Sequence, residues 1–115
     1  MALSDLERKK TDRAMLNYVE RIRPPVEMRD KLDISYRISD QSVVVFTLRP
    51  RWQDPSQIRE SLVAKATFVR SAGVWKIYWM RADLKWHSYP EKPQVSSIAG
   101  FIKIVEADDF GCFWG

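Results

Sequence analysis

The 115-residue chain has the length of one domain and leaves no room for two separate hydrophobic cores. Its composition, 45% hydrophobic and 30% charged, is too apolar for a disordered protein. The formal net charge is +4, and all of the excess positive charge lies between Arg49 and His87. This stretch contains eight Lys and Arg residues but only three Asp and Glu residues. We therefore expect one folded domain over residues 1–115, with an anionic partner as one hypothesis for its basic middle third.

Cysteine usage and hydropathy indicate the compartment. Cys112 is the only cysteine, so no intramolecular disulfide can form. The first residues run directly into charges and lack the apolar region of a signal peptide. The longest wholly apolar run, residues 43–46, is far shorter than the roughly 20 residues that a membrane-spanning helix needs. These features predict a soluble cytoplasmic protein without a membrane partner.

The N-terminal region has the pattern of a capped amphipathic helix. Ser4 and Glu7 have the spacing of a capping box. An apolar stripe at helical spacing follows, made of Met15, Tyr18, Val19 and Ile22. Pro24 and Pro25 then stop the helix, which we predict over residues 5–22.

Four strands are predicted next. Strict alternation over residues 32–39 indicates a half-buried strand, and Asp40-Gln41 is placed for a two-residue hairpin loop. A β-branched run over 43–48 predicts the second strand, which Pro50 closes, and residues 51–59 are expected to form a loop. The third strand is predicted over 62–70 and the fourth from Val74 to at least Ala82, with an end at Trp86 as the longer alternative. Residues 71–73, ending in Gly73, fit a three-residue loop between them.

The C-terminal region predicts a second helix. Pro90 and Pro93 break the chain, and a stripe of apolar residues follows Ser96 or Ser97 as the helix cap, giving a helix over about 96–107. The tail at 110–115 is rich in aromatic residues, so we expect it to dock on the domain. The order α-β-β-β-β-α predicts an α+β fold, a four-stranded antiparallel meander flanked by an N-terminal and a C-terminal helix.

The fourth strand carries the strongest candidate site. If it stays extended to Trp86, its even positions form the core face, and its odd positions begin with Trp75 and Trp79 and end in a row of ionisable side chains. This row is Arg81, Asp83, Lys85 and His87. With the three-residue loop, Lys65 joins the same face. In one interpretation this is a binding face, with Trp75 and Trp79 as stacking or apolar platforms, cations from Lys65, Arg81, Lys85 and His87, and Asp83 holding Arg81 and Lys85 in place. In the other, a helix covers the tryptophans and the row is a surface ion-pair ladder.

The loop after the second strand is a further candidate. The loop contains Arg49, Arg51 and Trp52 close together in sequence. Their guanidinium and indole groups could bind phosphate or stack on a base. Equally, Trp52 could pin the loop down while the arginines stay solvated.

Catalytic and metal-binding patterns are weak. Cys112 and His87 could pair as nucleophile and base, but nothing in the sequence brings them together, and Asp83 is too far from His87 in an extended strand unless the chain turns at Leu84. No spacing of metal ligands and no glycine-rich phosphate loop occurs. We expect no enzymatic activity, no metal and no cofactor.

Several segments together resemble a known family. They are YVERIRPP at 18–25, RPRW at 49–52, AKAT at 64–67, VWKIYWMRADLKWHSY at 74–89 and GCFWG at 111–115. With these segments the chain resembles the bacterial proteins grouped as domain of unknown function 3024. The resemblance implies no activity and no site residue.

The residues leave two hypotheses about function. The first is a small non-enzymatic binding module whose basic, tryptophan-bearing sheet face contacts an anionic partner, with nucleic acid as one candidate. The alternative is a protein-interaction or homodimerising domain in which exposed aromatic residues anchor the interface.

Overall fold

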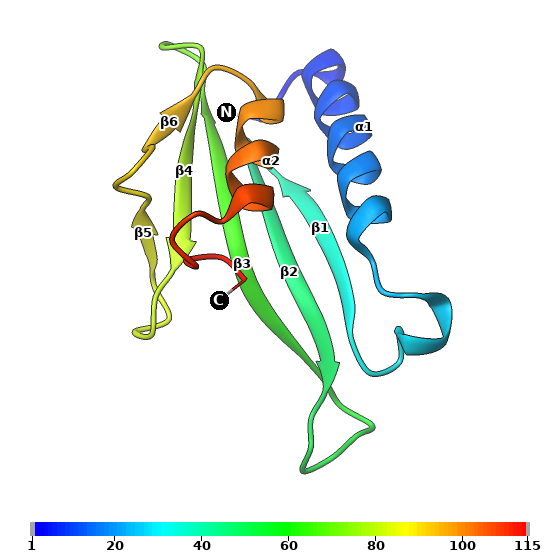
Figure 1. Cartoon of the computed structure of the whole chain (residues 1–115). Coiled ribbons are helices and arrows are strands. Elements are labelled where there is room, and N and C mark those ends of the chain that lie inside the picture. Colours follow the sequence, from blue (N-terminus) through cyan, green and yellow to red (C-terminus); the bar gives the residue numbers. More distant parts are fainter. Residues whose placement is uncertain (1, 115) are drawn as a thin grey trace.

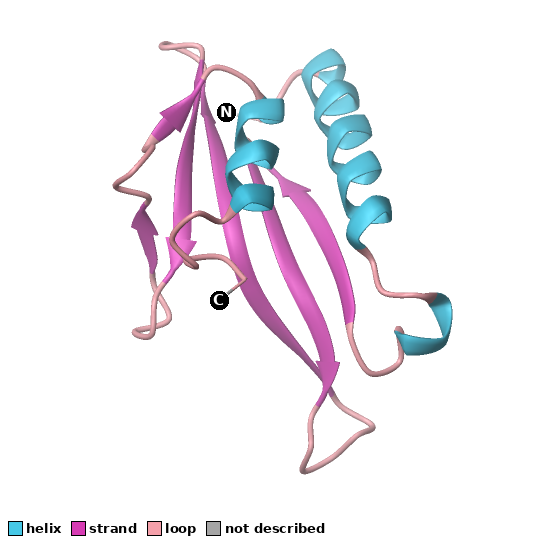
Figure 2. Cartoon of the chain, viewed as in Figure 1, coloured by secondary structure: helices cyan, strands magenta, loops and turns pink. Residues whose placement is uncertain are grey.

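The computed structural model describes residues 2–114 and has an α+β fold (Figures 1 and 2). Its elements are α1 (Asp5–Ile22), the 3₁₀ helix η1 (Val26–Met28), β1 (Asp33–Ser39), β2 (Ser42–Pro50), β3 (Ile58–Val69), β4 (Val74–Met80), β5 (Trp86–Ser88), β6 (Gln94–Val95) and α2 (Ile98–Ala107). The strands form one antiparallel sheet in the order β1-β2-β3-β4-β5, with β6 also paired to β4. The predicted fold class is confirmed, but the described sheet has six strands instead of four.

Both helices begin at the predicted caps. The Glu7 N–H donates to Ser4 Oγ at 3.2 Å, and the Ser4 N–H donates to Glu7 Oε1 at 2.8 Å, which completes the capping box. α1 ends before Pro24 and Pro25, as predicted. Ser97 caps α2 by accepting from the Gly100 N–H at 3.2 Å.

The core lies between the two helices and one face of the sheet (Figure 1). Trp75 and Ile77 on β4 face this core and are buried, Trp75 to 6% exposure. They belong to one cluster with residues of β2 and of both helices, namely Val43, Val45, Met15, Val19, Phe101 and Val105. The prediction that the even positions of β4 form the core face is therefore wrong.

The faces of β4 were predicted wrongly because the β3–β4 loop is one residue longer than expected. Val69 pairs with Val74, so the loop has four residues, 70–73, and not the predicted three. Because side chains alternate along a strand, this shift moves every side chain to the opposite face relative to its partner strand. Ala64 and Ala66 thus share the helix-covered face with Trp79 and Ile77, while Lys65 pairs with Tyr78 on the opposite face, which we call the open face.

The sheet edge beyond β4 is interrupted. The Ile77 N–H donates to Pro93 O at 3.0 Å, but Pro93 has no N–H to return the bond. Instead, the Tyr89 N–H donates to Ile77 O at 2.9 Å. The segment between Tyr89 and Pro93 therefore loops out, and β5 and β6 form two short halves of one edge strand. The fourth strand, predicted to reach at least Ala82, ends at Met80, and its longer alternative to Trp86 is wrong, because the chain turns back after Met80.

The β2–β3 hairpin extends beyond its neighbours. β1 reaches only as far as the Asp33–Leu48 pair, and β4 ends at Met80, whereas β2 and β3 remain paired out to Pro50 and Ile58. The strand predicted to begin at 62 begins at Ile58 instead. We call residues 49–59 the hairpin tip, and Figure 1 shows it projecting from the lower end of the sheet.

The described part of the aromatic tail docks, as predicted. Phe113 is buried, and its ring centre lies 5.0 Å from that of Tyr89. The Asp108 carboxylate accepts from the N–H groups of Phe113 and Trp114 at 3.0 and 2.8 Å. Met1 and Gly115, which complete the predicted domain and tail, lie outside the described residues.

The lowered pKa of Glu7 predicts that the stability of the fold depends on pH in the acid range. The Arg70 guanidinium, with the Ser4 N–H, lowers the pKa of Glu7 from 4.5 to about 2. Between these values the unfolded state binds more protons than the folded state, so the stability due to Glu7 is lost as pH falls through this window. The melting temperature of Glu7→Gln, measured from pH 6 to about 2, should fall less steeply with acid than that of the wild type. A Glu27→Gln control at an exposed position should keep the wild-type slope, and equal slopes for all three proteins would contradict the assignment.

Candidate functional site

The residues of the predicted sheet face and of the predicted loop contact fall in three separate places. Arg49 and Arg51 lie in the hairpin tip, and Lys65 lies on the open face. Trp79 lies on the helix-covered face, next to the β4–β5 hairpin that carries the four ionisable residues of the predicted row. One continuous face with all of these side chains does not exist.

The β4–β5 hairpin replaces the predicted row of charges. The Arg81 N–H donates to Lys85 O at 3.3 Å, and Leu84 takes a left-handed conformation with φ of 61°. This turn brings Asp83 back to His87, whose Nε2 lies 2.8 Å from Asp83 Oδ2. Asp83 Oδ1 also accepts from the Lys85 N–H at 3.0 Å. The hydrogen bond with His87 lowers the pKa of Asp83.

Asp83 is therefore a turn residue. Its carboxylate closes the hairpin through one backbone N–H and the imidazole, whereas the sequence predicted that it holds the Arg81 and Lys85 side chains. No ion pair joins Asp83 to either of these cations among the described residues.

Trp79 belongs to the β4 strand of this hairpin, and its side chain lies on the helix-covered face. It pairs with His87 across the strands, and the Arg81 guanidinium carbon lies 5.4 Å from its ring centre. Its Nε1 is buried and has no hydrogen-bond partner among residues 2–114. Trp75, the other proposed platform, is covered by the helices, as the structural interpretation expected.

Lys65 is at the centre of an aromatic cluster on the open face. Its Nζ lies 4.9 Å from the ring centre of Tyr78 and 5.2 Å from that of Trp86. Burial between these rings lowers the pKa of Lys65. Within the described chain Lys65 forms no ion pair, while the other open-face cation near an aromatic ring, Arg37 over Phe46, is paired with Glu60.

The hairpin tip carries three unpaired cations and an exposed indole. Arg49 and Arg59 are directly opposite each other across the two strands, and Arg51 follows in the loop. None of the three guanidiniums has an ion-pair or hydrogen-bond partner for its side chain within residues 2–114. Trp52 is 88% exposed, so the alternative in which it pins the loop down is wrong.

The loop holds its own shape without Trp52. The Arg51 N–H donates to Gln57 O at 2.8 Å, and Asp54 Oδ1 accepts from the Ser56 N–H and hydroxyl at 3.2 and 2.6 Å. The indole is therefore available at the surface. The sequence analysis missed Arg59 because it predicted residues 51–59 as a loop. Only the pairing register of β2 and β3, which places Arg59 opposite Arg49, identifies it as a neighbour of the other arginine.

The candidate nucleophile lacks the features of an activated thiol. Burial raises the pKa of Cys112, the reverse of what thiolate chemistry needs. The nearest polar partner of its Sγ is Phe110 O at 4.0 Å, whereas His87 is bonded to Asp83. Across residues 2–114 no three His, Cys, Asp or Glu side chains gather as metal ligands, and no helix is long and apolar enough to cross a membrane.

Comparison with known proteins matches one family model to residues 3–115, and its description is Domain of unknown function (DUF3024). No curated protein and no solved structure matches the chain.

The strained turn gives a stability prediction. Leu84 is 78% exposed, so its side chain contributes little packing, while its left-handed backbone costs roughly 1–2 kcal/mol. Leu84→Gly should raise the free energy of unfolding by up to about 1 kcal/mol, because glycine removes the strain but gains freedom in the unfolded state. Ala82→Gly in the same turn, where φ is not positive, should instead destabilise. Urea denaturation of both variants tests the pair, and a loss of stability in Leu84→Gly would contradict the prediction.

Proposed function

The chain belongs to the family Domain of unknown function (DUF3024), and we propose that it is a non-enzymatic module that binds single-stranded nucleic acid through its hairpin tip. The observation that carries the proposal is that the hairpin tip combines three unpaired guanidiniums with the exposed indole of Trp52. As part of the proposal, the protein acts in the cytoplasm of a bacterium.

The arrangement of Arg49 and Arg59 favours an anionic ligand. Like charges directly opposite each other in an antiparallel pair are destabilising, and no carboxylate of the described chain pairs with either guanidinium. A bound phosphate would relieve this repulsion, and the guanidinium fork matches its oxygens. Asp54 is the one acidic residue between Arg49 and Arg59, so the tip keeps a positive charge.

Trp52 favours a ligand with accessible bases. An exposed indole beside cations provides a stacking surface for any unpaired base, and this stacking is largely independent of sequence. In a duplex the faces of the bases are stacked on each other and inaccessible. The exposed indole of Trp52 therefore favours a single strand.

Two further groups of cations can extend the contact. Lys65, between Tyr78 and Trp86 on the open face, combines an unpaired ammonium with aromatic rings. Arg81, Lys85 and His87 on the β4–β5 hairpin form a separate basic region near Trp79. These groups are secondary in the proposal because the hairpin tip alone combines unpaired cations with a fully available ring.

The competing function is a protein interface or homodimer. Trp and Arg are also the residue types that dominate protein–protein hot spots, and Ile58 adds an exposed apolar side chain to the tip. The two functions differ in their response to salt, since phosphate contacts release counterions whereas an apolar interface does not.

Fluorescence anisotropy with labelled oligothymidylate and oligouridylate of about 20 nucleotides tests the proposal. The wild type should bind at about 50 mM salt and lose affinity steeply towards about 200 mM. Arg49→Ala/Arg59→Ala should reduce the slope of log affinity against log salt by up to about 1.4, or about 0.7 for each lost phosphate contact. Trp52→Ala should weaken binding by about 1–3 kcal/mol.

Matched controls remove the same groups elsewhere. Arg8→Ala/Arg13→Ala deletes two exposed arginines of α1, and Phe110→Ala deletes an exposed ring near the C-terminus; both should bind like the wild type. A wild type that binds neither oligonucleotide at low salt, and that has a dimeric mass by light scattering abolished by Trp52→Ala, would favour the interface and refute the proposal.

A further inference from the structure

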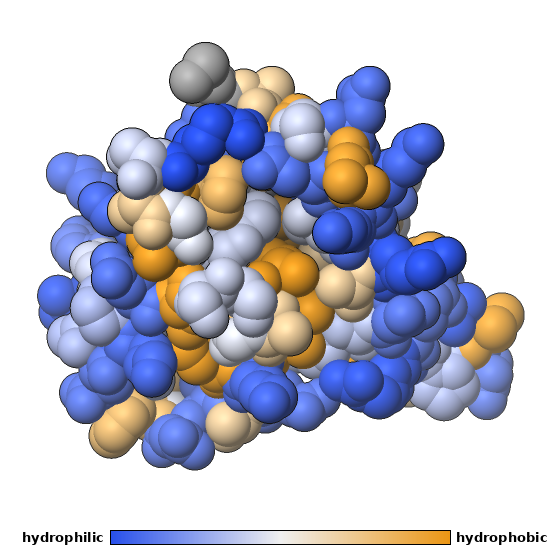
Figure 3. Space-filling view, turned by 90° about the horizontal axis from the view of Figure 1, so that it is seen from above, coloured by the Kyte–Doolittle hydropathy of each residue, from blue (hydrophilic) through white to orange (hydrophobic). Residues whose placement is uncertain are grey.

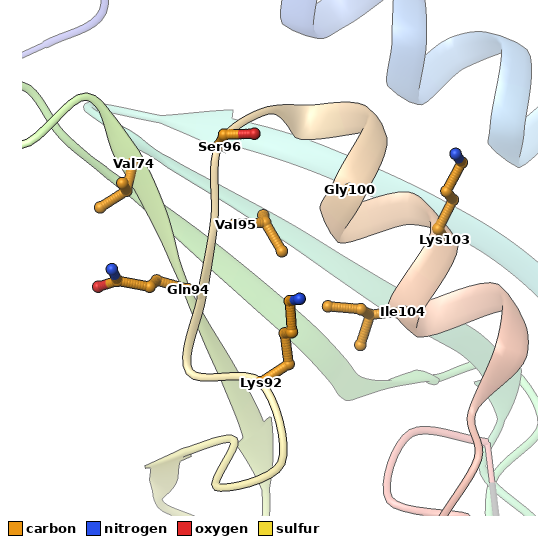
Figure 4. Close-up of a pocket in the computed structure, with 8 residues that line it drawn as sticks. All are labelled: Val74, Lys92, Gln94, Val95, Ser96, Gly100, Lys103 and Ile104. Carbon is orange, nitrogen blue, oxygen red and sulfur yellow. The ribbon is translucent and has the colours of Figure 1, made fainter.

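A groove runs along the sheet edge between β6 and α2 (Figure 4). β6 lies on the opposite side of β4 from β2 and its hairpin tip (Figure 1). Its volume is about 530 Å³, in the range of ligand-binding sites. Val95 and Ile104 form apolar walls, and Lys92, Lys103, Gln94 and Ser96 supply polar groups. We call this the edge groove.

The position of α2 beside β6 depends on a glycine. A Cβ on Gly100 would lie 3.0 Å from the Cβ of Val95, tighter than nine in ten such contacts, so a larger residue would require Val95 to move by a few tenths of an ångström. Gly100 thus lets the helix pack tightly against the edge strand, and this contact shapes the floor of the groove.

The edge strand presents backbone groups to the groove. Pro93 O accepts from the Ile77 N–H, so the Pro93 carbonyl points towards β4. Val95, two residues further along and paired with Trp75, directs its backbone groups the same way. By the alternation of an antiparallel ladder, the N–H and C=O of Gln94 then point away from β4. No hydrogen bond from the described chain meets these groups, and the backbone groups of Lys92 and Ser96, on either side of β6, also have no hydrogen-bond partner within residues 2–114.

The residues that line the groove include two lysines and no acidic residue, while Glu91 and Asp109 line the neighbouring pocket that Lys92 also borders. Neither Lys92 nor Lys103 forms an ion pair within residues 2–114. Figure 4 shows Lys92 extending between Val95 and Ile104, with Lys103 on the adjoining turn of α2. Both lysines therefore line the groove, Lys92 beside the strand and Lys103 on the helix.

We propose that the edge groove binds an extended acidic peptide, which adds to the sheet as a strand beside residues 92–96. The free backbone groups supply the main-chain hydrogen bonds, and the apolar walls receive alternate side chains of the peptide. Lys92 and Lys103 pair with its carboxylates. A second copy of the same edge would bring these lysines towards like charges, which opposes self-pairing and favours an acidic partner.

A fluorescent peptide that alternates Glu and Val is the probe, and its anisotropy is measured against the full chain at low salt. The wild type should bind it, and Lys92→Glu/Lys103→Glu should bind at least about tenfold more weakly. A peptide with Lys in place of Glu should not bind. Lys9→Glu/Lys31→Glu, which reverses two exposed charges elsewhere, should bind nearly like the wild type.

A modified peptide tests the backbone pairing without changing the protein. N-methylation of alternate peptide residues removes their N–H donors and should abolish binding to the wild type, and amide NMR shifts should map to Gln94, Ser96 and Gly100. Equal affinity for the methylated peptide, equal affinity of Lys92→Glu/Lys103→Glu, or no binding by the wild type would overturn the proposal. Arg49→Ala/Arg59→Ala should bind the peptide normally, so this result and the nucleic-acid result can fail independently.

Discussion

The pairing register between β3 and β4 is the constraint on which the rest of the structure depends. Four loop residues between Val69 and Val74 set this register, and the register decides which side chains the helices cover. It places Trp75 and Ile77 against α1 and α2, where their area supplies much of the core, and leaves Lys65 with Tyr78 on the open face. A loop one residue shorter would pair the aromatic residues of β4 with the opposite face of β3.

A missing backbone donor has a comparable effect at the sheet edge. Because Pro93 cannot donate to Ile77 O, Tyr89 takes that acceptor and the edge strand divides into β5 and β6. The division creates the short strand against which α2 packs through Gly100, and it leaves part of the edge without a partner. Short, interrupted and lysine-bearing edges resist pairing with copies of themselves, so the same features that protect this edge restrict the kind of partner it can accept.

The basic charge of the middle third is distributed by topology into distinct regions. Adjacent strands of a meander carry neighbouring sequence segments to opposite ends and faces of the sheet, so charges close in sequence become separated in space. The hairpin tip receives Arg49, Arg51 and Arg59, the open face receives Lys65, and the β4–β5 turn receives Arg81, Lys85 and His87. Of these regions, the hairpin tip combines several guanidiniums without carboxylate partners with an exposed aromatic ring.

Local patterns determined α1 with its capping box, the cap of α2, the Asp40-Gln41 turn and the α+β class, because capping, proline stops and strand alternation act over a few residues. They also identified Arg49, Arg51 and Trp52 as a group, since these residues are adjacent in the chain. Only the tertiary structure decided the faces of β4, the turn at Leu84 and the meeting of Arg49 with Arg59. Each of these depends on a pairing register, and a register is set by the competition of many distant contacts for one buried face, which no local pattern contains.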